Sequence, residues 1–367
     1  MNIKELCVDL QSCGVQMPNG SFGQRGGAGP AEGCTLIIRG HWCTVPTQSW
    51  YVGRSPYRIL TEDDTIVLYR HNVPLCNVQL PPPPRFYRMH TPRGIPLEKI
   101  ALMHGENCLA STVYQDCRYW ATPHQCQFCG IGLSLQRGST TLIKDPEDLA
   151  LAAQVAALYD GARHVTLTTG AWRDEIHGAA HLAACVRTIK QSSRLPVHVQ
   201  ICPPKHLDVI DRLKHSGADT IGLHIDIPDE TVRSRVAPGK AQVDYKIYHA
   251  SWEYAVRVFG KNQVSSFLIA GLGETAEKML TAIEHLCELG VFPYVVPLRP
   301  IPGTPLEHAQ PPDADYMKAL YHHTARILEK YGLSSQLSKA GCVCCGACSS
   351  LALFETTQQA KDRDESL

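Results

Sequence analysis

The sequence predicts an α/β protein built round a partial (β/α)6 barrel of the TIM type. From about residue 96, apolar runs of strand length alternate with segments that carry helix start and stop signals. The runs are almost continuously apolar, which is typical of parallel strands buried beneath helices. Six such strands would make three-quarters of a (β/α)8 barrel, and they are expected at 99–104, 164–169, 197–201, 220–225, 264–270 and 292–298.

Helices are expected between these strands. The clearest follows Asp145, has Pro146 in its first turn and ends before Gly161. Asp at the N-cap and Pro in the first turn are common helix starts, and Gly commonly follows a helix end. Others are expected at 177–190, 207–215, 245–259, 275–289 and 313–331.

The first 95 residues predict a small, mainly β N-terminal domain, with strands at 34–39, 49–52 and 65–69. Its Gly-rich stretch at 24–33 lacks the Gly-Lys-Ser/Thr ending of a phosphate loop, so we expect a flexible or ligand-covering loop. Four prolines at 81–84 form a stiff extended spacer. The expected division is 1–95, a barrel over 96–305, a C-terminal helix and cysteine segment over 306–355, and a disordered tail over 356–367.

Composition narrows the class of protein. Among 367 residues, Lys+Arg and Asp+Glu both total 35, which leaves no basic field for nucleic acid or an anionic membrane. The N-terminus lacks a signal-peptide pattern, and no apolar run approaches 18 residues. Sixteen cysteines, several tightly clustered, favour a reduced cytoplasmic protein that uses thiolates as metal ligands.

The stretch CRYWATPHQCQFC places Cys117, Cys126 and Cys129 on one loop after the first predicted strand. Three thiolates can hold a cubic iron–sulfur cluster and leave one iron open to a substrate or cofactor. The alternative is a structural zinc site, with His124 as the fourth ligand.

Polar, glycine and cysteine residues gather where the predicted strands end. In barrels of this kind the chemistry lies at the carboxyl ends of the strands, so these positions predict a site. They are His104-Gly105, Thr168-Thr169-Gly170, Gln200 with Cys202, His224 with Asp226, Gly271 to Glu274, and Arg299-Pro300.

A second cysteine group lies near the C-terminus, in KAGCVCCGACSS. Cys342, Cys345 and Cys348 form C-x2-C-x2-C, and Cys344 is a candidate fourth ligand. We interpret the group as an auxiliary iron–sulfur cluster. A zinc knuckle and a thiol trap for a soft metal or metalloid are the competing interpretations.

Over about residues 96–305 the chain resembles the radical S-adenosylmethionine (SAM) superfamily. The resemblance rests on the CQFC half of the motif, on FLIAGLGE and on the fourth strand with its following segment, IGLHIDIPDETVRSRVAPGK. The first gap, from Cys117 to Cys126, holds eight residues where the family has three. Thr168-Thr169-Gly170 stands where many relatives have Gly-Gly-Glu, so the acidic contact to the SAM amino group is missing.

The resemblance implies a 4Fe–4S cluster on Cys117, Cys126 and Cys129, with SAM bound to its open iron. Arg233, Arg235 or Lys240 would meet the SAM carboxylate, and His224 and Asp226 stand at ribose-facing positions. The SAM contacts that it implies are Phe128, Thr168, Thr169, Gly170, His224, Asp226, Arg235, Gly271, Gly273 and Glu274.

A closer resemblance, carried by VPTQSWYVGRSPY, RVAPGK and VVPLRPIPGTP among other segments, is to an uncharacterised radical SAM subfamily encoded in nitrilase-containing gene clusters, with a biotin-synthase-like barrel. It implies reductive cleavage of SAM to a 5′-deoxyadenosyl radical that abstracts hydrogen from a small molecule. An electron donor such as flavodoxin or ferredoxin is implied as a partner. The rival interpretation is a non-catalytic iron–sulfur or zinc protein, acting as a scaffold or as a metal or metalloid carrier.

Overall fold

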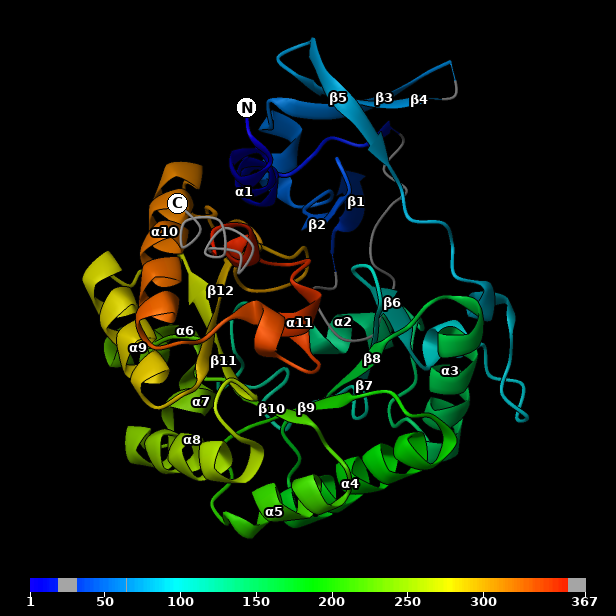
Figure 1. Cartoon of the computed structure of the whole chain (residues 1–367), viewed down its shortest axis with the longest axis vertical. Helices are drawn as coiled ribbons and strands as arrows, with labels where there is room; N and C mark the ends of the chain where they lie inside the picture. Colours follow the sequence, from blue (N-terminus) through cyan, green and yellow to red (C-terminus); the bar gives the residue numbers. More distant parts are fainter. Residues whose placement is uncertain (19–31, 64, 356–367) are drawn as a thin grey trace, which may run out of the picture.

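The computed structural model describes residues 1–18, 32–63 and 65–355, and its larger sheet is a curled half-barrel (Figure 1). The strand order is β12-β11-β10-β9-β8-β7-β6, and β7 to β12 are parallel. This confirms the predicted partial barrel. The strands are β6 Leu102–His104, β7 Cys108–Thr112, β8 His164–Thr168, β9 Val197–Ile201, β10 Thr220–Leu223, β11 Val264–Ala270 and β12 Phe292–Pro297.

The expected first strand at 99–104 is wrong. Its last residues form β6, which pairs antiparallel with β7 at the edge of the sheet. Gly105, at φ 59°, turns the chain straight back, so the first parallel strand is β7. In consequence His104 lies opposite Cys108, at the amino end of β7, and not at the carboxyl edge where the sequence predicted it.

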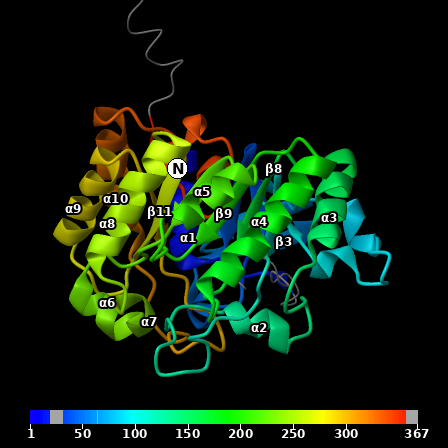
Figure 2. The same ribbon diagram turned by 90° about the horizontal axis from the view of Figure 1, so that it is seen from below.

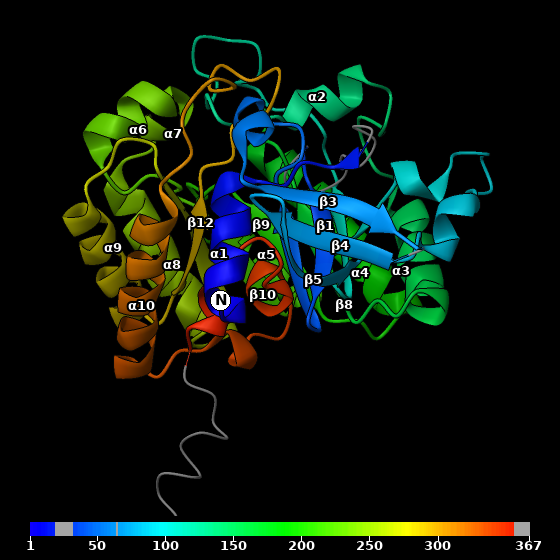
Figure 3. The ribbon, with the colours of Figure 1, turned by 90° about the horizontal axis from the view of Figure 1, so that it is seen from above.

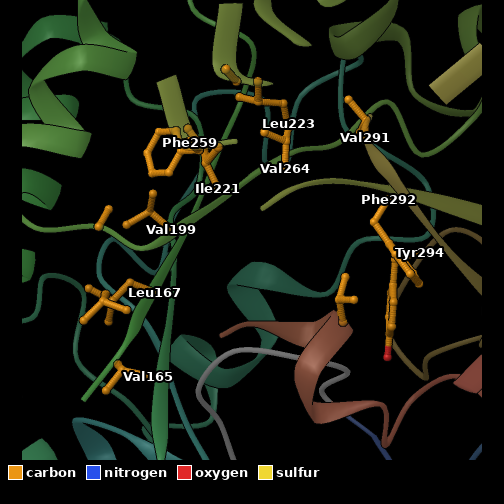
Figure 4. Packing of buried hydrophobic residues seen from close by; sticks show 14 of the residues in the cluster. Val165, Leu167, Val199, Ile221, Leu223, Phe259, Val264, Val291, Phe292 and Tyr294 are labelled. Atoms are coloured by element: carbon orange, nitrogen blue, oxygen red, sulfur yellow. The ribbon is translucent and has the colours of Figure 1, made fainter. Parts of the chain in front are cut away.

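Helices cover the convex face of the half-barrel (Figure 2). Strand side chains that point outward, such as Val165, Leu167, Val199 and Ile221, form the main core beneath these helices (Figure 4). The α-helices of residues 96–355, on this face and elsewhere, are α2 Ile131–Gln136, α3 Pro146–Tyr159, α4 Glu175–Ser192, α5 Asp208–His215, α6 Glu230–Val236, α7 Pro238–Ala241, α8 Tyr245–Phe259, α9 Ala276–Glu288, α10 Ala314–Lys330 and α11 Cys342–Cys345. The Asp145 cap is confirmed, since its side chain accepts from the Glu147 backbone N–H.

The N-terminal section has its own sheet and core. Helix α1 (Ile3–Cys13) packs on an antiparallel sheet of order β2-β1-β5-β4-β3. The expected strands at 34–39 and 65–69 are confirmed, whereas the run at 49–52 opens a 3-10 helix, Trp50–Arg54, because its backbone bonds back three residues. The strands are β1 Cys34–Ile38, β2 His41–Val45, β3 Tyr57–Glu62, β4 Thr65–Arg70 and β5 Val73–Gln79.

Two of the sequence predictions fall outside the described residues. Most of the Gly-rich stretch, at 24–31, is among them, and so is the tail at 356–367. Among the described residues, none of the helices is both long enough and apolar enough to cross a membrane.

The C-terminal segment and the N-terminal sheet close the open side of the half-barrel. Helix α11 lies inside the curve, between β12 and β8 (Figure 1), and β1 to β5 lie across it (Figure 3). The Thr44 N–H donates to the Ala347 carbonyl at 2.8 Å, and Thr220 Oγ1 donates to the Ala340 carbonyl at 3.4 Å. The cysteine segment is thereby held between the two sheets.

Candidate active site

A cavity of about 330 Å³ lies in the concave face of the half-barrel. It runs along β7, whose alternate residues Cys108, Ala110 and Thr112 line it. Both cysteine groups reach it. The first loop contributes Phe128, Cys129 and Gly130, and the C-terminal segment contributes Cys342, Cys345 and Cys348.

The Cys117–Cys129 loop is anchored to three other parts of the chain through its backbone. The Arg118 N–H donates to the Ala171 carbonyl at 2.8 Å, the Gln127 N–H to the Val236 carbonyl at 2.8 Å, and the Gly239 N–H to the His124 carbonyl at 3.0 Å. Cys126 and Phe128 pack against the apolar cluster of Val232, Leu272 and Leu298. The loop is therefore fixed by tertiary contacts as well as by its own turns.

Burial controls the protonation of Cys126 and Cys129. It raises the pKa of Cys129 to about 11, against the lowering effect of the Ile131 backbone N–H. Burial also raises the pKa of Cys126, and Lys240 partly opposes it. Because metal ligands must be thiolates, a bound metal has to displace these protons, so metal binding here would release protons.

His124 takes no part in the cavity. It is exposed, and its Nδ1 is 3.2 Å from Gln242 Nε2. His124, which the sequence suggested as a fourth zinc ligand, therefore faces α7 and the turn that follows it.

Gly170 allows the end of β8 to touch the cysteine loop. A Cβ atom on this residue would lie 1.7 Å from the Asp116 carbonyl oxygen, closer than any pair of non-bonded atoms can approach. Thr168 lines the main cavity, while Thr169 and Gly170 line a second cavity of about 150 Å³ beside Arg118 and Lys240.

Asp226 and Lys240 form a buried ion pair beside the cysteine loop. Asp226 lines the main cavity, and the Lys240 ammonium also donates to the His224 carbonyl at 2.8 Å. Burial lowers the pKa of Lys240, but Asp226 outweighs it and holds the pKa above its usual value. Of the three basic residues considered for the SAM carboxylate, Lys240 is the one that the structure joins to Asp226.

The other two have different partners. Arg233 is buried, and its Nη1 donates to the Ile227 carbonyl at 2.8 Å. Arg235 reaches the Leu272 carbonyl at 3.5 Å, at the turn after β11. Arg233 thus hydrogen-bonds the backbone just before α6, and Arg235 contacts the glycine-rich turn after β11.

His224 is stacked on Phe267, with ring centroids 4.3 Å apart, and its Nδ1 accepts from the Phe267 N–H. Burial, followed by the Lys240 charge, lowers its pKa to about 3. The ring is therefore neutral at physiological pH, and its Nε2 has no hydrogen-bond partner among the residues that the structure describes.

Glu274 stabilises the turn that follows β11. Its two carboxylate oxygens accept from the backbone N–H groups of Gly271 at 2.7 Å and Leu272 at 2.8 Å. Gly271 and Gly273 have φ of 98° and 110°, a region that favours glycine. These residues shape the turn, and they are not among those that line the 330 Å³ cavity.

The C-terminal cysteines face the cavity from the opposite side to the loop. Gln200 Nε2 lies 3.3 Å from Cys342 Sγ. Cys344 is exposed and does not line the cavity, so the structure separates it from its three neighbours.

Two residues beside this group carry no motif in the sequence. His104 Nδ1 is 3.4 Å from Cys345 Sγ, and His104 Nε2 is 3.3 Å from Cys348 Sγ. Cys108 packs against Cys345 as well. In the sequence these two residues show only as a His-x3-Cys spacing at 104–108. The spacing indicates a shared site only once the β6–β7 hairpin is known to pair them.

The residues present fit the cofactors that the resemblance implies. The C-terminal group supplies three thiols to the cavity, and the loop supplies Cys129, with Cys117 and Cys126 on the same loop. Each iron of a cluster takes a single cysteine, so the sulfurs need not converge on one point. Over residues 1–18, 32–63 and 65–355, no three His, Cys, Asp or Glu side chains are grouped to hold a single metal ion.

Comparison with known proteins gives a family match over the centre of the chain. The model of the radical SAM superfamily matches residues 122–286. The match includes Cys126 and Cys129 and strands β8 to β11, and it begins after Cys117.

Curated relatives match parts of the chain. Lipoyl synthase from Ectopseudomonas mendocina (strain ymp) is 26% identical over 233 residues, which cover 57% of this chain and 63% of the relative. Bacteriochlorophyllide c C-7(1)-hydroxylase from Chlorobaculum limnaeum is 25% identical over 141 residues, covering 38% and 35%. The chain thus spans between about a third and two-thirds of the length of these relatives.

Among solved structures, methylornithine synthase is 16% identical with a TM-score of 0.46, over 60% of this chain and 61% of that chain. The FeFe-hydrogenase maturase HydG from Carboxydothermus hydrogenoformans is also 16% identical with a TM-score of 0.46, over 61% and 51%. The match to the radical SAM superfamily therefore covers the central part of the half-barrel and the second half of the cysteine loop.

Proposed function

We propose that the chain is a radical SAM enzyme that acts on a small-molecule substrate held in the 330 Å³ cavity. The observation that carries the proposal is the position of the Cys117–Cys129 loop. The loop follows β7 at the carboxyl edge of the parallel strands, and its third cysteine opens into the cavity. Barrel enzymes carry their chemistry at this edge.

Cys117, Cys126 and Cys129 would hold a 4Fe–4S cluster whose fourth iron is left for SAM. When bound, the reduced cluster supplies the electron that cleaves SAM, giving a 5′-deoxyadenosyl radical that abstracts hydrogen from the substrate. A flavodoxin or ferredoxin is the proposed source of that electron. Since all sixteen cysteines lie in the described residues and all are free thiols, we place the protein in the cytosol.

The chain's own residues would bind and orient SAM. Phe128, Thr168 and Asp226 line the cavity beside the cysteine loop and are proposed as direct contacts. Lys240, which Asp226 holds as a buried cation, is the proposed partner of the SAM carboxylate. A lysine that is already desolvated and charged can bind a carboxylate at little reorganisation cost.

Thr169, Gly170, His224, Arg235, Gly271, Gly273 and Glu274 are proposed to complete the SAM site. Gly170 acts by letting the β8 end lie against the loop, and Glu274 acts by fixing the β11 turn. His224 offers an unpaired Nε2 as a neutral hydrogen-bonding group.

We propose that Cys342, Cys345 and Cys348 hold an auxiliary iron–sulfur cluster on the other side of the same cavity. Residues 1–95 are proposed as a small domain that closes the half-barrel, 96–305 as the barrel and 306–355 as the auxiliary segment. Assignment to the nitrilase-cluster subfamily belongs to the proposal as well, and rests on the N-terminal and C-terminal segments that resemble it.

The test is anaerobic reconstitution with iron and sulfide, followed by reduction with dithionite in the presence of SAM. The expected result is a brown protein with broad absorption near ~400 nm from thiolate–iron charge transfer, which releases 5′-deoxyadenosine. A colourless, zinc-loaded protein that leaves SAM intact would favour the scaffold or metal-carrier interpretation instead.

A further inference from the structure

Two residues of a hairpin that lies more than 200 positions earlier in the chain contact the C-terminal cysteines. His104 ends β6, Cys108 begins β7, and the two residues are register partners across the hairpin. His104 contacts Cys345 and Cys348, and Cys108 packs against Cys345.

The hairpin fits closely round this segment. At Gly105 a Cβ atom would lie 2.6 Å from Cys345 Sγ and 3.0 Å from Ala347 Cβ, so the turn accepts the segment because it has no side chain there. Cys108, Ala110 and Cys345 form one small apolar cluster. Cys108 is 2% exposed, and its sulfur is also 3.3 Å from Thr166 Oγ1.

Four sulfurs therefore surround one part of the cavity wall. Cys108 lines the cavity together with Cys342, Cys345 and Cys348, while the exposed Cys344 does not. We propose that Cys108 is the fourth thiolate ligand of the C-terminal cluster, and that His104 is a hydrogen-bonding neighbour of its sulfurs. The inference rests on the proposed function in one respect, namely that the C-terminal site holds an iron–sulfur cluster.

The number of ligands decides what the cluster can do. Three cysteines would leave an iron open, and a substrate could bind to it directly. Four cysteines occupy every iron of a 4Fe–4S cluster. The substrate must then be held by cavity side chains, and the cluster would serve as an electron relay or as a source of sulfur.

His104 contacts two different sulfurs through its two ring nitrogens. A neutral ring carries one N–H and can donate a hydrogen bond to one of these two sulfurs. Hydrogen bonds to cluster sulfurs stabilise the added negative charge of the reduced state. His104 is therefore a positioning and tuning residue.

The test uses the full chain with Cys117, Cys126 and Cys129 replaced by Ala, so that iron reports the C-terminal site alone. In this background Cys108→Ala and Cys108→Ser are compared with Cys185→Ala, a control at a buried cysteine of α4 that does not line the cavity. Bound iron is measured after reconstitution, and the reduced cluster is examined by electron paramagnetic resonance with and without cyanide, which binds an open iron.

The expected result is that cyanide leaves the spectra of the parent and the Cys185→Ala variant unchanged but shifts those of both Cys108 variants, which should also retain less iron. The Ser variant keeps the shape of the side chain, so it separates loss of a ligand from loss of packing. A cyanide response in the parent, or Cys108 variants that match the control, would overturn the assignment of Cys108. A parent that binds no iron would overturn it too, together with the auxiliary cluster, whereas SAM cleavage by the wild type would still support the first cluster.

His104→Leu should keep its iron but lower the midpoint potential of the C-terminal cluster, because hydrogen bonding from the ring to sulfur is lost. His104→Gln, which restores one donor, should recover part of the shift. Loss of iron in His104→Leu would make His104 a ligand, and an unchanged potential would remove its tuning role.

Discussion

The two cysteine groups that line the cavity are built in different ways. The first lies on one loop of thirteen residues, 117–129, and its spacing is visible in the sequence. The second combines the C-terminal segment with a hairpin at 102–112. The first group lies at the carboxyl edge of the strands, and Cys108 of the second begins β7. The cavity between them runs the length of that strand.

The two groups represent two ways of building a cluster site. A local loop holds its ligands through its own turns and is anchored from outside by β8, α6 and α7. A site assembled from distant segments exists only when the whole domain is folded, and here the N-terminal sheet holds the C-terminal segment in place through Thr44 and Ala347. The two groups should therefore respond independently to substitution of their cysteines.

The largest expected effect comes from the loop. Cys126→Ala or Cys129→Ala should reduce dithionite-driven formation of 5′-deoxyadenosine to the level seen without enzyme, because SAM cleavage requires the cluster that these thiolates hold. Product is measured by liquid chromatography with mass spectrometry, and iron at the C-terminal site should persist. Cys117→Ala tests the long spacing: if it cleaved SAM at the wild-type rate, the loop would have a different third ligand.

The second prediction concerns removal of the C-terminal cysteines instead of those of the loop. Replacement of Cys342, Cys345 and Cys348 by Ala should lower bound iron from about eight to about four per chain, for two four-iron clusters. SAM cleavage without substrate should largely survive, because the first cluster has its own ligands. Mössbauer spectroscopy with iron analysis checks it. Iron content equal to that of the wild type would contradict an auxiliary cluster and favour zinc or a thiol trap.

Sequence reasoning succeeded where the signal was local. The alternation of strands and helices predicted the half-barrel, and the Asp145-Pro146 pair predicted the start of α3. It failed at the first strand, because an apolar run at 99–104 looks the same whether it pairs parallel or antiparallel. That one error moved His104 to the wrong edge of the sheet and hid its proximity to the C-terminal cysteines.

The remaining site residues could not be ranked from sequence because their roles depend on tertiary partners. Arg233, Arg235 and Lys240 are equally basic in the sequence. Only the fold shows that Arg233 bonds backbone carbonyls and that Lys240 pairs with Asp226. Cys108 lies in no cysteine motif of the sequence, and only the hairpin places it against Cys345.

The third prediction concerns stability near the loop. Lys240→Met leaves the Asp226 carboxylate buried without its cation, which should cost about 3–5 kcal/mol of unfolding free energy. Chemical denaturation of the cluster-free protein measures it. Because the folded-state pKa of Lys240 is raised, the contribution of the pair is complete below the ordinary lysine pKa of about 10.4 and is lost only as the pH rises above it.

A matched control is Lys330→Met, whose ion pair with Glu284 is exposed and screened by water, so its loss should change the stability little. The double change of Asp226→Asn with Lys240→Met should recover much of the lost stability but not SAM binding. Equal effects of Lys240→Met and Lys330→Met would show that the Asp226 pair is not effectively buried.

The smallest expected effect comes from the contact between β8 and the cysteine loop. Gly170→Ala would place a methyl group 1.7 Å from the Asp116 carbonyl oxygen, and because that atom is backbone the loop itself must move. We expect a loss of about 1–3 kcal/mol in unfolding free energy and weaker SAM binding by the cluster-loaded protein, measured by calorimetry. Gly53→Ala is the control, since a Cβ atom there meets nothing within 4 Å. The C-terminal site should keep its iron in both variants, because its ligands come from β7 and the C-terminal segment. Unchanged SAM affinity in Gly170→Ala would mean that the loop tolerates the shift, and the β8 end would then have no part in positioning the first cluster.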